Sequence, residues 1–473
     1  MKSEPSPSSG NAGTSGQPAL VRARQLLRIK AVWLTPLVLG SVVVALIAAF
    51  YIGSVVNPLG NLHGLPVAVV NADHGATAGT RTVDIGAQVQ SGLSHAPAVA
   101  DRLGLTDTTL SAAEHSMQRD GYYATVVIPP DFSASLLGLT GVPTTGPAPG
   151  RPQITILTNQ RAGSQGVSLA TGILEPALAA ASRSIGRELS AAAPAGASSP
   201  ASKTFLADPV TVVAVQYRPL PSHTALGLSA FYIALLTLMC GFLGGIIVNS
   251  SADAGLGYAT TEIGPRWRQR RPVPISRWQT LLLKWVIAAP LTGVVTGVML
   301  LVAAGIFRMD APDVVLLWLL AWLCAASVAA GTIVLFAVLG ASFGQLIAIL
   351  LFVYGGLASA GGTVPPQALP TFFRWIGQLE PLRQVLAGTR SILYFGAQAD
   401  AGLTRAVTLA SAGLVFWLIV GTIAVRWYDR KGLHRMSPEL LAYVRSAADS
   451  YKSGETGGNQ AGTGGGPDPA ADG

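Results

Sequence analysis

The chain has 473 residues, of which 50% are hydrophobic and only 11% are charged. Soluble globular domains carry roughly 25% charged residues, so this composition argues against a soluble protein and indicates a membrane protein. The formal net charge of +8 would suit nucleic acid, but the basic residues gather beside apolar segments, where they signal orientation, and we expect no nucleic-acid partner.

Both ends of the sequence differ in composition from the rest. Residues 1–20 are rich in Ser, Gly and Pro, which favours a disordered tail. A short basic stretch at 21–30 then leads into the first apolar segment, and we interpret it as an amphipathic lead-in. The segment 427–473 ends in a similar Ser- and Gly-rich stretch and is predicted to form a second tail.

Six segments lack Asp, Glu, Lys and Arg and resemble membrane-spanning helices, which take about 20 apolar residues. We place the first span at 31–53 and treat it as a retained anchor, because its apolar stretch exceeds the roughly 7–15 residues of a signal peptide. The fourth and fifth spans share one charge-free stretch, which we divide at Gly340–Gly344 because glycines punctuate helices. The last five spans, within 223–426, are predicted at 225–248, 285–307, 314–340, 345–360 and 406–425.

Lys and Arg cluster before the first span, between the second and third spans, and after the sixth. Cytoplasmic flanks carry the excess of basic residues, so all three clusters and both termini are predicted to lie in the cytoplasm. Residues 54–222 then lie outside the plasma membrane. Four arginines in the outer loop after the fifth span depart mildly from this rule: Arg374, Arg383, Arg390 and Arg405.

The region 54–222 is predicted to be a small α/β domain with a partly parallel sheet, because strands and helices alternate along it. Strands are predicted at 65–70, 124–128, 153–157 and 210–217. Helices are predicted at 79–93, 111–119, 131–139 and 163–189, the last broken near Pro176, with a linker at 190–203. The predicted fold class is a membrane all-α bundle of six helices, one plus five, with this extracytoplasmic α/β domain inserted between spans one and two.

The sequence shows no catalytic arrangement. His63, Asp73 and His74 lie close together but lack the spacing of a metal site, and no Gly-x-Ser-x-Gly motif marks a serine hydrolase. We therefore expect no metal, no cofactor and no enzymatic activity, and rank a lipid-modifying enzyme last. The sequence has no P-loop, and no predicted span carries the ionisable residues that ion-driven pumps use. A separate subunit would have to power any transport.

Two parts of the sequence resemble known membrane proteins. The segment GGTVPPQALPTFFRWIGQLEPLRQVLAGTRSILYFG, which begins at Gly361, resembles the outer loop of ABC type-2 permeases. The segments YIGSVVNPLGNLHGLPVAVVNADHGA and GYYATVVIPPDFSASLL resemble the YhgE/Pip group and the nitrosoguanidine-resistance (SNG-type) membrane proteins. In those groups a strand ends in an Asn-x-Asp turn, and a second strand runs into Pro-x-x-Phe-Ser. The matching residues are Asn71, Asp73, Pro129, Phe132 and Ser133.

This resemblance implies a six-span permease that forms a homodimer and takes a separate ATP-binding subunit. Type-2 permeases contact that subunit through the loop between spans two and three and a helix before span one, here 252–279 and 21–28. The candidate docking residues in the loop are Glu262, Arg266, Arg268, Arg270 and Arg271. For the arginines, the positive-inside bias is the preferred explanation over a docking role, whereas topology does not require Glu262.

The outer loop 361–396 allows two interpretations. Pro365, Pro366 and Pro370 break helical structure, and polar backbone at membrane depth needs protein or a water-filled cavity around it. In a re-entrant loop of this kind, Glu380, Arg383 and Arg390 would pair near the outer mouth of a pathway. Alternatively, the loop is an interfacial helix that the aromatic residues Phe372, Phe373 and Trp375 anchor among lipid headgroups.

The function predicted from these features is an ABC type-2-like export permease that moves a hydrophobic or amphipathic compound across the plasma membrane, in contact with membrane lipid. The alternative is a membrane-anchored receptor or secretion-assembly scaffold of the YhgE/Pip type, whose spans only hold the outer domain in place. A neighbouring gene for an ATPase would favour the exporter.

Overall fold

The structure is a computed structural model that describes residues 30–78, 81–140, 151–192, 205–268 and 270–433, with Arg435, Ala442, Tyr443 and Ser446 beyond them. The tail predicted at 1–20, most of the lead-in at 21–30 and nearly all of the second tail beyond 433 lie outside these residues. So does most of the predicted linker. The chain divides into two units, Met1–Gly53 and Ser54–Gly473, which are described in turn.

The first unit contains most of one long helix, α2 (Lys30–Val55). Leu37–Val55 within it is long and apolar enough to cross a membrane. Lys30, at the start of the helix, is its only charged residue. The helix therefore coincides with the first membrane span, which the sequence predicts at 31–53.

The second unit begins with a mixed five-stranded sheet in the order β4-β1-β5-β6-β7. Neighbouring strands are parallel except β5 and β6, which are antiparallel. The strands are β1 (Leu65–Asn71), β4 (Leu103–Asp107), β5 (Ala124–Ile128), β6 (Gln153–Thr158) and β7 (Thr211–Gln216). The prediction located all of these to within two residues except β4, whose sequence LGLTD has too short an apolar run to stand out.

Helices cover both faces of this sheet. On one face, Val67 and Val69 of β1 lie in the core that α3 (Ile85–His95), α6 (Phe132–Gly138) and α7 (Ser164–Ala192) also form. On the other face, Ala68 and Val70 pack with Ala113 of α5 (Leu110–Met117). Alternate residues of one buried strand therefore serve two cores. The short helix α4 (Pro97–Ala100) adds Val99 to the first core.

Two helices differ from the prediction. Helix α7 continues through Pro176 instead of breaking there, because Leu174 and Leu178 on either side of the proline are fully buried in the core. Helix α3 begins at Ile85 and not at 79, because Arg81–Val83 forms strand β3, which pairs with β2 (Ala76–Ala78). The Asp84 side chain then caps the helix by accepting the Ala87 N–H at 2.8 Å.

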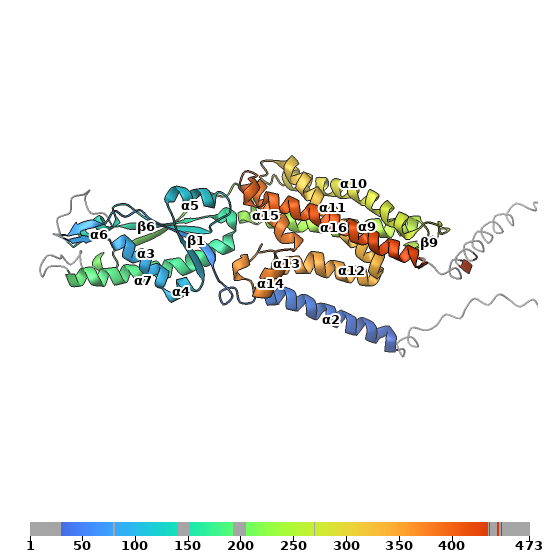
Figure 1. The fold of residues 1–473 in the computed structure, drawn as a ribbon, viewed down its shortest axis with the longest axis horizontal. Helices are drawn as coiled ribbons and strands as arrows, with labels where there is room; N and C mark the ends of the chain where they lie inside the picture. Colours follow the sequence, from blue (N-terminus) through green and yellow to red (C-terminus); the bar gives the residue numbers. More distant parts are fainter. Residues whose placement is uncertain are drawn as a thin grey trace, which may run out of the picture. The chain divides into compact units, whose positions relative to one another are not determined.

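The rest of the second unit is a helical bundle with five candidate membrane spans, which bring the total to six among the described residues. Figure 1 shows α9, α10, α11 and α16 running side by side, and α11 contacts the other three. Four of these spans are α9 (Ser229–Gly255), α10 (Arg277–Leu300) with a π-helical extension η3 (Leu301–Ile306), α11 (Val314–Leu339) and α16 (Leu403–Arg430). The remaining span, Ala341–Ser359, consists of α12 (Ala341–Ile349) and the two short elements that follow it. The six candidate spans support the prediction of a multi-pass membrane protein.

Helices α9 and α11 approach closely through small residues. A Cβ atom at Gly241 would lie 2.5 Å from the Ala325 carbonyl oxygen, and one at Gly245 would lie 2.9 Å from the Thr332 side chain. Close approach at a small-xxx-small pair is a common way for membrane helices to associate. The division between α11 and α12 falls at Gly340, whose φ of 83° favours glycine, as the sequence predicts.

After α12 the chain passes through a π-helical turn, η4 (Leu350–Tyr354), and α13 (Gly355–Ser359), and then re-enters the protein. The following segment contains η5 (Pro366–Ala368), α14 (Thr371–Ile376), α15 (Pro381–Tyr394) and η6 (Ala399–Ala401). Helix α15 is largely buried against α9 and α16. On α14, Phe372 and Trp375 are exposed whereas Phe373 is buried, so only two of the three proposed aromatic anchors face outward.

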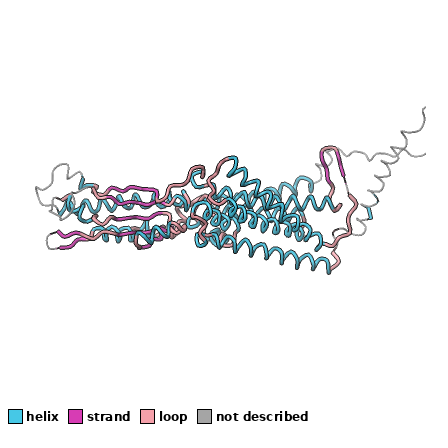
Figure 2. Tube along the Cα trace, turned by 90° about the horizontal axis from the view of Figure 1, so that it is seen from above, coloured by secondary structure: helices cyan, strands magenta, loops and turns pink. Residues whose placement is uncertain are grey.

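Within the second unit, the sheet and a small hairpin lie at opposite ends of the bundle. The hairpin consists of β8 (Thr261–Ile263) and β9 (Arg266–Arg268), between α9 and α10. Figure 2 shows the long strands at one end of the helices and this hairpin at the other. A membrane around the bundle would therefore place them on opposite sides.

Candidate functional site

The motif residues at the end of β1 form a hydrogen-bonded junction. The Asp73 carboxylate accepts the Gly86 N–H at 3.0 Å and the Ser133 N–H at 3.1 Å. It also accepts the Ser133 hydroxyl, whose oxygen accepts the Ile85 N–H at 2.8 Å. The carboxylate therefore binds the first turns of α3 and α6, where backbone N–H groups lack helical partners.

The other motif residues support the same junction. The Asn71 Oδ1 atom accepts the Asp73 N–H at 3.1 Å and so shapes the turn. Phe132 is fully buried in the core, and its N–H reaches the Pro129 carbonyl. The structure thus brings all five motif residues together, in a structural role. Within the described residues, no three His, Cys, Asp or Glu side chains gather as metal ligands would.

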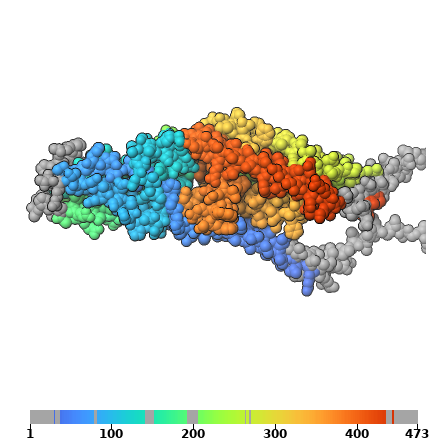
Figure 3. All heavy atoms as spheres, in the orientation of Figure 1, coloured from blue at the N-terminus to red at the C-terminus, as the bar shows by residue number. Residues whose placement is uncertain are grey.

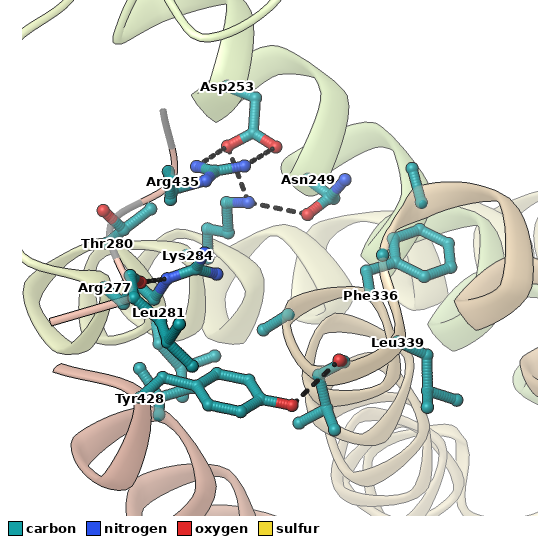
Figure 4. A pocket seen from close by; sticks show the side chains of 16 residues that line it. Asn249, Asp253, Arg277, Thr280, Leu281, Lys284, Phe336, Leu339, Tyr428 and Arg435 are labelled. Carbon is teal, nitrogen blue, oxygen red and sulfur yellow. Dashed lines mark hydrogen bonds and ion pairs between the residues drawn. The ribbon is translucent and has the colours of Figure 1, made fainter. Parts of the chain in front are cut away.

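A second cluster lies at the end of the bundle near the β8–β9 hairpin (Figure 4). Asp253 of α9 pairs with Lys284 of α10 at 2.8 Å and with both guanidinium nitrogens of Arg435, at 2.5 and 2.7 Å. Lys284 also donates to Asn249 at 2.6 Å, and its side chain is only 5% exposed. These residues line a cavity of about 560 Å³.

This cluster corrects the prediction that the spans at 225–248 and 285–307 stop short of any charge. The helices run on to Gly255 and back to Arg277, and so contain Asp253 and Lys284. Buried charges are tolerated when they are paired and hydrogen-bonded, and here each charge has such a partner. The apolar pattern could not reveal this extension, because it ends where the charges begin.

The helix ends beside this cluster are fastened to each other. Asp429 of α16 accepts the N–H groups of Arg277 and Trp278, at 3.1 and 3.0 Å, in the first turn of α10. A carboxylate at a helix N-terminus is favourable because the N–H groups there are unpaired. The Arg277 side chain donates to the Leu433 carbonyl at 2.6 Å, so the chain after α16 is held as well.

The predicted docking residues lie on or just after the hairpin. Glu262 is on β8, Arg266 and Arg268 are on β9, and Arg270 and Arg271 follow, all of them exposed. The structure therefore brings residues of both charges onto one accessible feature. The second predicted docking segment, 21–28, lies outside the described residues.

A third site is a cavity of about 810 Å³ where the α/β region meets the re-entrant segment. Figure 3 shows the cyan residues of that region packed directly against the orange residues of the bundle. The charged residues that line the cavity are Arg119, Asp120, Arg383, Arg390, Asp400 and Arg405. Arg119 and Asp400 pair at 2.6 Å. Among the described residues, Arg383, Arg390 and Arg405 form no ion pair.

Those three arginines have weak partners or none. Arg383 donates to the Arg374 carbonyl at 3.5 Å, and Arg405 donates to the Gln378 carbonyl at 3.2 Å. Burial lowers the pKa of Arg383, and the charge of Arg405 lowers it further. Among the described residues that line the cavity, guanidinium groups therefore outnumber carboxylates.

Asp120 is the remaining carboxylate in this cavity. It lies in a turn with a left-handed φ of 62°. Burial raises the pKa of Asp120 from its ordinary 3.8 to about 7, against the opposing effect of the Arg390 charge. The same burial, with the charge of Asp120, raises the pKa of neighbouring Tyr123 to about 12. Near neutral pH, Asp120 is thus only partly ionised.

Glu380 does not pair with Arg383 or Arg390 in the part of the chain that the structure describes. It instead caps α15, because its Oε2 atom accepts the N–H groups of Leu382 and Arg383 at 2.8 and 3.4 Å. Its Oε1 atom is buried without a partner among the described residues. Burial raises the pKa of Glu380 from its ordinary 4.5 to about 8, although both N–H bonds oppose this.

The predicted helix breakers begin helices instead. Pro365 precedes η5, Pro366 is its first residue, and Pro370 precedes α14. Proline is well suited to the first turn of a helix, where its missing N–H would have no partner. The loop predicted at 361–396 thus contains two short helical elements, η5 and α14, in addition to the longer α15.

The bundle contains an apolar cavity of about 420 Å³ between α11, η4, α15 and α16. Val328, Phe352, Val385, Ala410 and Phe416 are among the residues that line it. Three side chains, Leu379, Gln384 and Leu409, line both this cavity and the cationic one. The two cavities are therefore neighbours with a common wall.

The family described as "Protein of unknown function (DUF3533)" matches residues 35–423. This chain belongs to that family. No curated protein matches it. The solved structures include a domain of a proposed ABC type-2 transporter from Thermotoga maritima, 19% identical, which matches 32% of this chain over 85% of its own length. The TM-score of that match is 0.23, too low to establish a shared fold.

For this DUF3533 chain, sequence reasoning located Arg383 and Arg390 but missed their surroundings. The small residues Ala406, Ala410 and Gly413 follow one face of α16 at helical spacing and line the apolar cavity. Such a stripe also occurs wherever helices pack closely, so it could not be read as a cavity. The contributions of Arg119, Asp120 and Asp400 depend on how the α/β region meets the bundle.

Proposed function

We propose that this protein is the permease subunit of an ABC type-2-like exporter, which moves a hydrophobic or amphipathic compound out across a bacterial plasma membrane. The observation that carries this proposal is the apolar cavity of about 420 Å³ between α11, η4, α15 and α16. Protein interiors are close-packed, and cavities of roughly 300–1,000 Å³ with apolar walls are typical ligand sites. Spans that only anchor an outer domain do not need such a space.

In this proposal the chain itself is not an enzyme, and a separate ATP-hydrolysing subunit supplies the energy. The exposed β8–β9 hairpin offers Glu262, Arg266 and Arg268 for docking that subunit. The ion pairs of Asp253 with Lys284 and Arg435 would hold the helix ends beside the hairpin in place while the subunit binds. The hairpin is then cytoplasmic, with both termini, and the sheet is extracytoplasmic.

The YhgE/Pip-like motif and the outer loop of type-2 permease kind, both quoted above, add support from the sequence. They also suggest a homodimer within the lipid bilayer. The competing proposal of a receptor or assembly scaffold uses the same six spans and the same outer sheet. It differs in needing neither the apolar cavity nor an ATPase, and an experiment can separate the two on those points.

The experiment has two parts. Affinity purification in mild detergent, followed by an ATPase assay, is expected to recover a partner whose activity depends on this protein. Efflux of Nile red and a panel of amphiphilic antibiotics is then compared between cells with the native chain and cells with Ala410→Trp, which fills the cavity. The matched control is Val415→Trp on the same helix, because Val415 is 53% exposed and does not line the cavity.

Export is expected to fall with Ala410→Trp and to persist with Val415→Trp. An intact protein that co-purifies with no ATPase, and whose deletion changes the efflux of no compound, would rule out the exporter and leave the scaffold. Equal efflux by both tryptophan variants, at equal membrane levels, would show that the apolar cavity does not take part in export.

A further inference from the structure

The cationic cavity and the apolar cavity differ in chemistry but share a wall. The first is lined by four arginines and two aspartates, and the second mainly by aliphatic and aromatic side chains. Leu379, Gln384 and Leu409 line both. A molecule lying across these three residues would have one end among charges and the other among apolar groups.

Charge pairing shows which sign of charge the first cavity would accept. Arg119 and Asp400 neutralise each other at 2.6 Å. Arg383, Arg390 and Arg405 then face Asp120 as the one unpaired carboxylate lining the cavity, within the described parts of the chain. An excess of guanidinium groups suits a carboxylate or a phosphate, whose oxygens match the planar fork of donors.

The positions of the arginines favour a role in binding an anion over a role as a positive-inside topology signal. Arg383 and Arg390 are seven residues apart on α15, so they lie on one face of that helix. Both line the cavity although the helix is otherwise largely buried. Membrane proteins usually concentrate such residues on the cytoplasmic side. These two instead line a cavity together with Arg119 and Asp120 of the α/β region, and Figure 1 shows α15 at the bundle end that carries the sheet.

The wall that the two cavities share contains one exposed apolar side chain and one buried polar side chain. Leu379 is 76% exposed, in the turn between α14 and α15. Gln384 is held in place, because its side-chain N–H groups donate to the Gly377 and Gln378 carbonyls at 3.2 and 2.9 Å. Leu379 is therefore largely solvent-exposed, whereas Gln384 is held by two hydrogen bonds.

We propose that the two cavities together bind one amphiphile, with an anionic carboxylate or phosphate headgroup at Arg383, Arg390 and Arg405 and an apolar tail in the cavity between α11, η4, α15 and α16. This rests on the proposed function in one respect, because it takes this amphiphile to be the exported compound. Binding itself does not depend on transport.

The test measures equilibrium binding to the full-length protein in phosphatidylcholine nanodiscs, with empty nanodiscs subtracted. The probes are radiolabelled dodecanoate and dodecyl phosphate, which differ only in the headgroup. Dodecanol and dodecyltrimethylammonium keep the tail and change the charge, and inorganic phosphate has no tail. We expect either anionic amphiphile to bind at least about tenfold more tightly than dodecanol, since a charged hydrogen bond contributes that much.

Variants place the binding in the cavities. Arg390→Gln and Arg383→Gln are each expected to weaken binding of the anionic amphiphile about tenfold, and Arg390→Lys to restore part of it. Ala410→Trp should abolish binding of the tail. The matched control is Arg308→Gln, because Arg308 is exposed between η3 and α11 and lines neither cavity. Size-exclusion profiles confirm that each variant is folded.

The outcomes separate this inference from the proposed function. Equal binding of dodecanol and the anions, or anion binding that the Arg383 and Arg390 variants leave unchanged, would overturn the inference. Inorganic phosphate binding as tightly as dodecyl phosphate would also overturn it, because the tail would then contribute nothing. Anion binding that these variants weaken, without efflux of any compound, would support the inference and count against export. The tighter of the two anions identifies the headgroup.

Discussion

The two ends of the bundle differ in how their charged side chains are paired. At the hairpin end, Asp253 is matched by Lys284 and Arg435 at 2.5 to 2.8 Å, and Asn249 accepts a further bond. At the sheet end, Arg383, Arg390 and Arg405 line a cavity and form no ion pair with any described residue. The charges at the hairpin end are paired within the protein. At the sheet end, the guanidinium N–H groups of the arginines are available to a ligand.

This difference indicates which charges hold the fold and which are available to a ligand. A side chain whose partners are all internal is expected to matter for stability. A cation that faces a cavity is expected to matter little for stability and much for binding. The following predictions test this division, from the largest expected effect to the smallest.

Asp253→Asn should have the largest effect on stability. The variant leaves Lys284, which is only 5% exposed, and Arg435 without an anion, and an uncompensated buried charge costs about 3–5 kcal/mol. Thermal unfolding in detergent should show a clear loss of stability. The double variant Asp253→Leu/Lys284→Met, which removes the pair, should recover part of it. Unchanged stability of Asp253→Asn would contradict the structural role of this end.

Glu380→Gln should stabilise the protein at alkaline pH. Burial raises the pKa of Glu380 from 4.5 to about 8, so the folded protein holds this proton at pH values where the unfolded chain has lost it. The resulting stability is complete below pH 4.5 and disappears as the pH rises through 8. The amide needs no proton and can still cap α15, so a gain of about 1–3 kcal/mol is expected at pH 9.

The control for this measurement is the same pair of proteins at pH 4.5, where the carboxyl is protonated and the two should unfold alike. A gain of equal size at both pH values would show that ionisation of Glu380 is not its cause.

Asp120→Asn should remove a pH dependence from ligand binding. Because the pKa of Asp120 is about 7, lowering the pH from 8 to 6 largely neutralises this carboxylate, which lines the cationic cavity. An anionic amphiphile should then bind about fivefold more tightly at pH 6, from roughly 1 kcal/mol of removed repulsion. Dodecanesulfonate is the probe, since its own charge stays constant. The variant should bind equally at both pH values, and a native protein without pH dependence would exclude this role for Asp120.

Arg390→Gln should have the smallest effect on stability, within about 1 kcal/mol, because the side chain makes no ion pair among the described residues. Unfolding of this variant is measured beside Asp253→Asn under the same conditions. A loss as large as that of Asp253→Asn would mean that the arginines at the sheet end are structural too, and the contrast between the ends would fail.

The sequence predicts elements well where a local pattern is strong. The apolar runs of β1 and β5 and the glycine that separates α11 from α12 stand out as regular features. Strand β4 and the break between β3 and α3 do not, since their signals are short and polar. Pro176 misleads, because buried neighbours outweigh its local preference.

The candidate sites divide in the same way. Arg383 and Arg390 can be linked from their spacing on one helix, and both line the cavity. The partners of Asp253 lie 31 and 182 positions away in the sequence, and no periodicity connects them. Asp120 and Asp400 reach the cavity from two separate elements, so only the tertiary structure brings them together.

Arg435 reaches the bundle from beyond the last span. Its guanidinium binds Asp253, and the preceding Leu433 carbonyl accepts the Arg277 side chain. A protease that cut the chain between 431 and 433 would release both contacts and leave the ends of α9 and α10 less firmly held. Trimming of this C-terminal extension would therefore act on the helical bundle, and a reporter fused at that point would disturb the fold it was meant to follow.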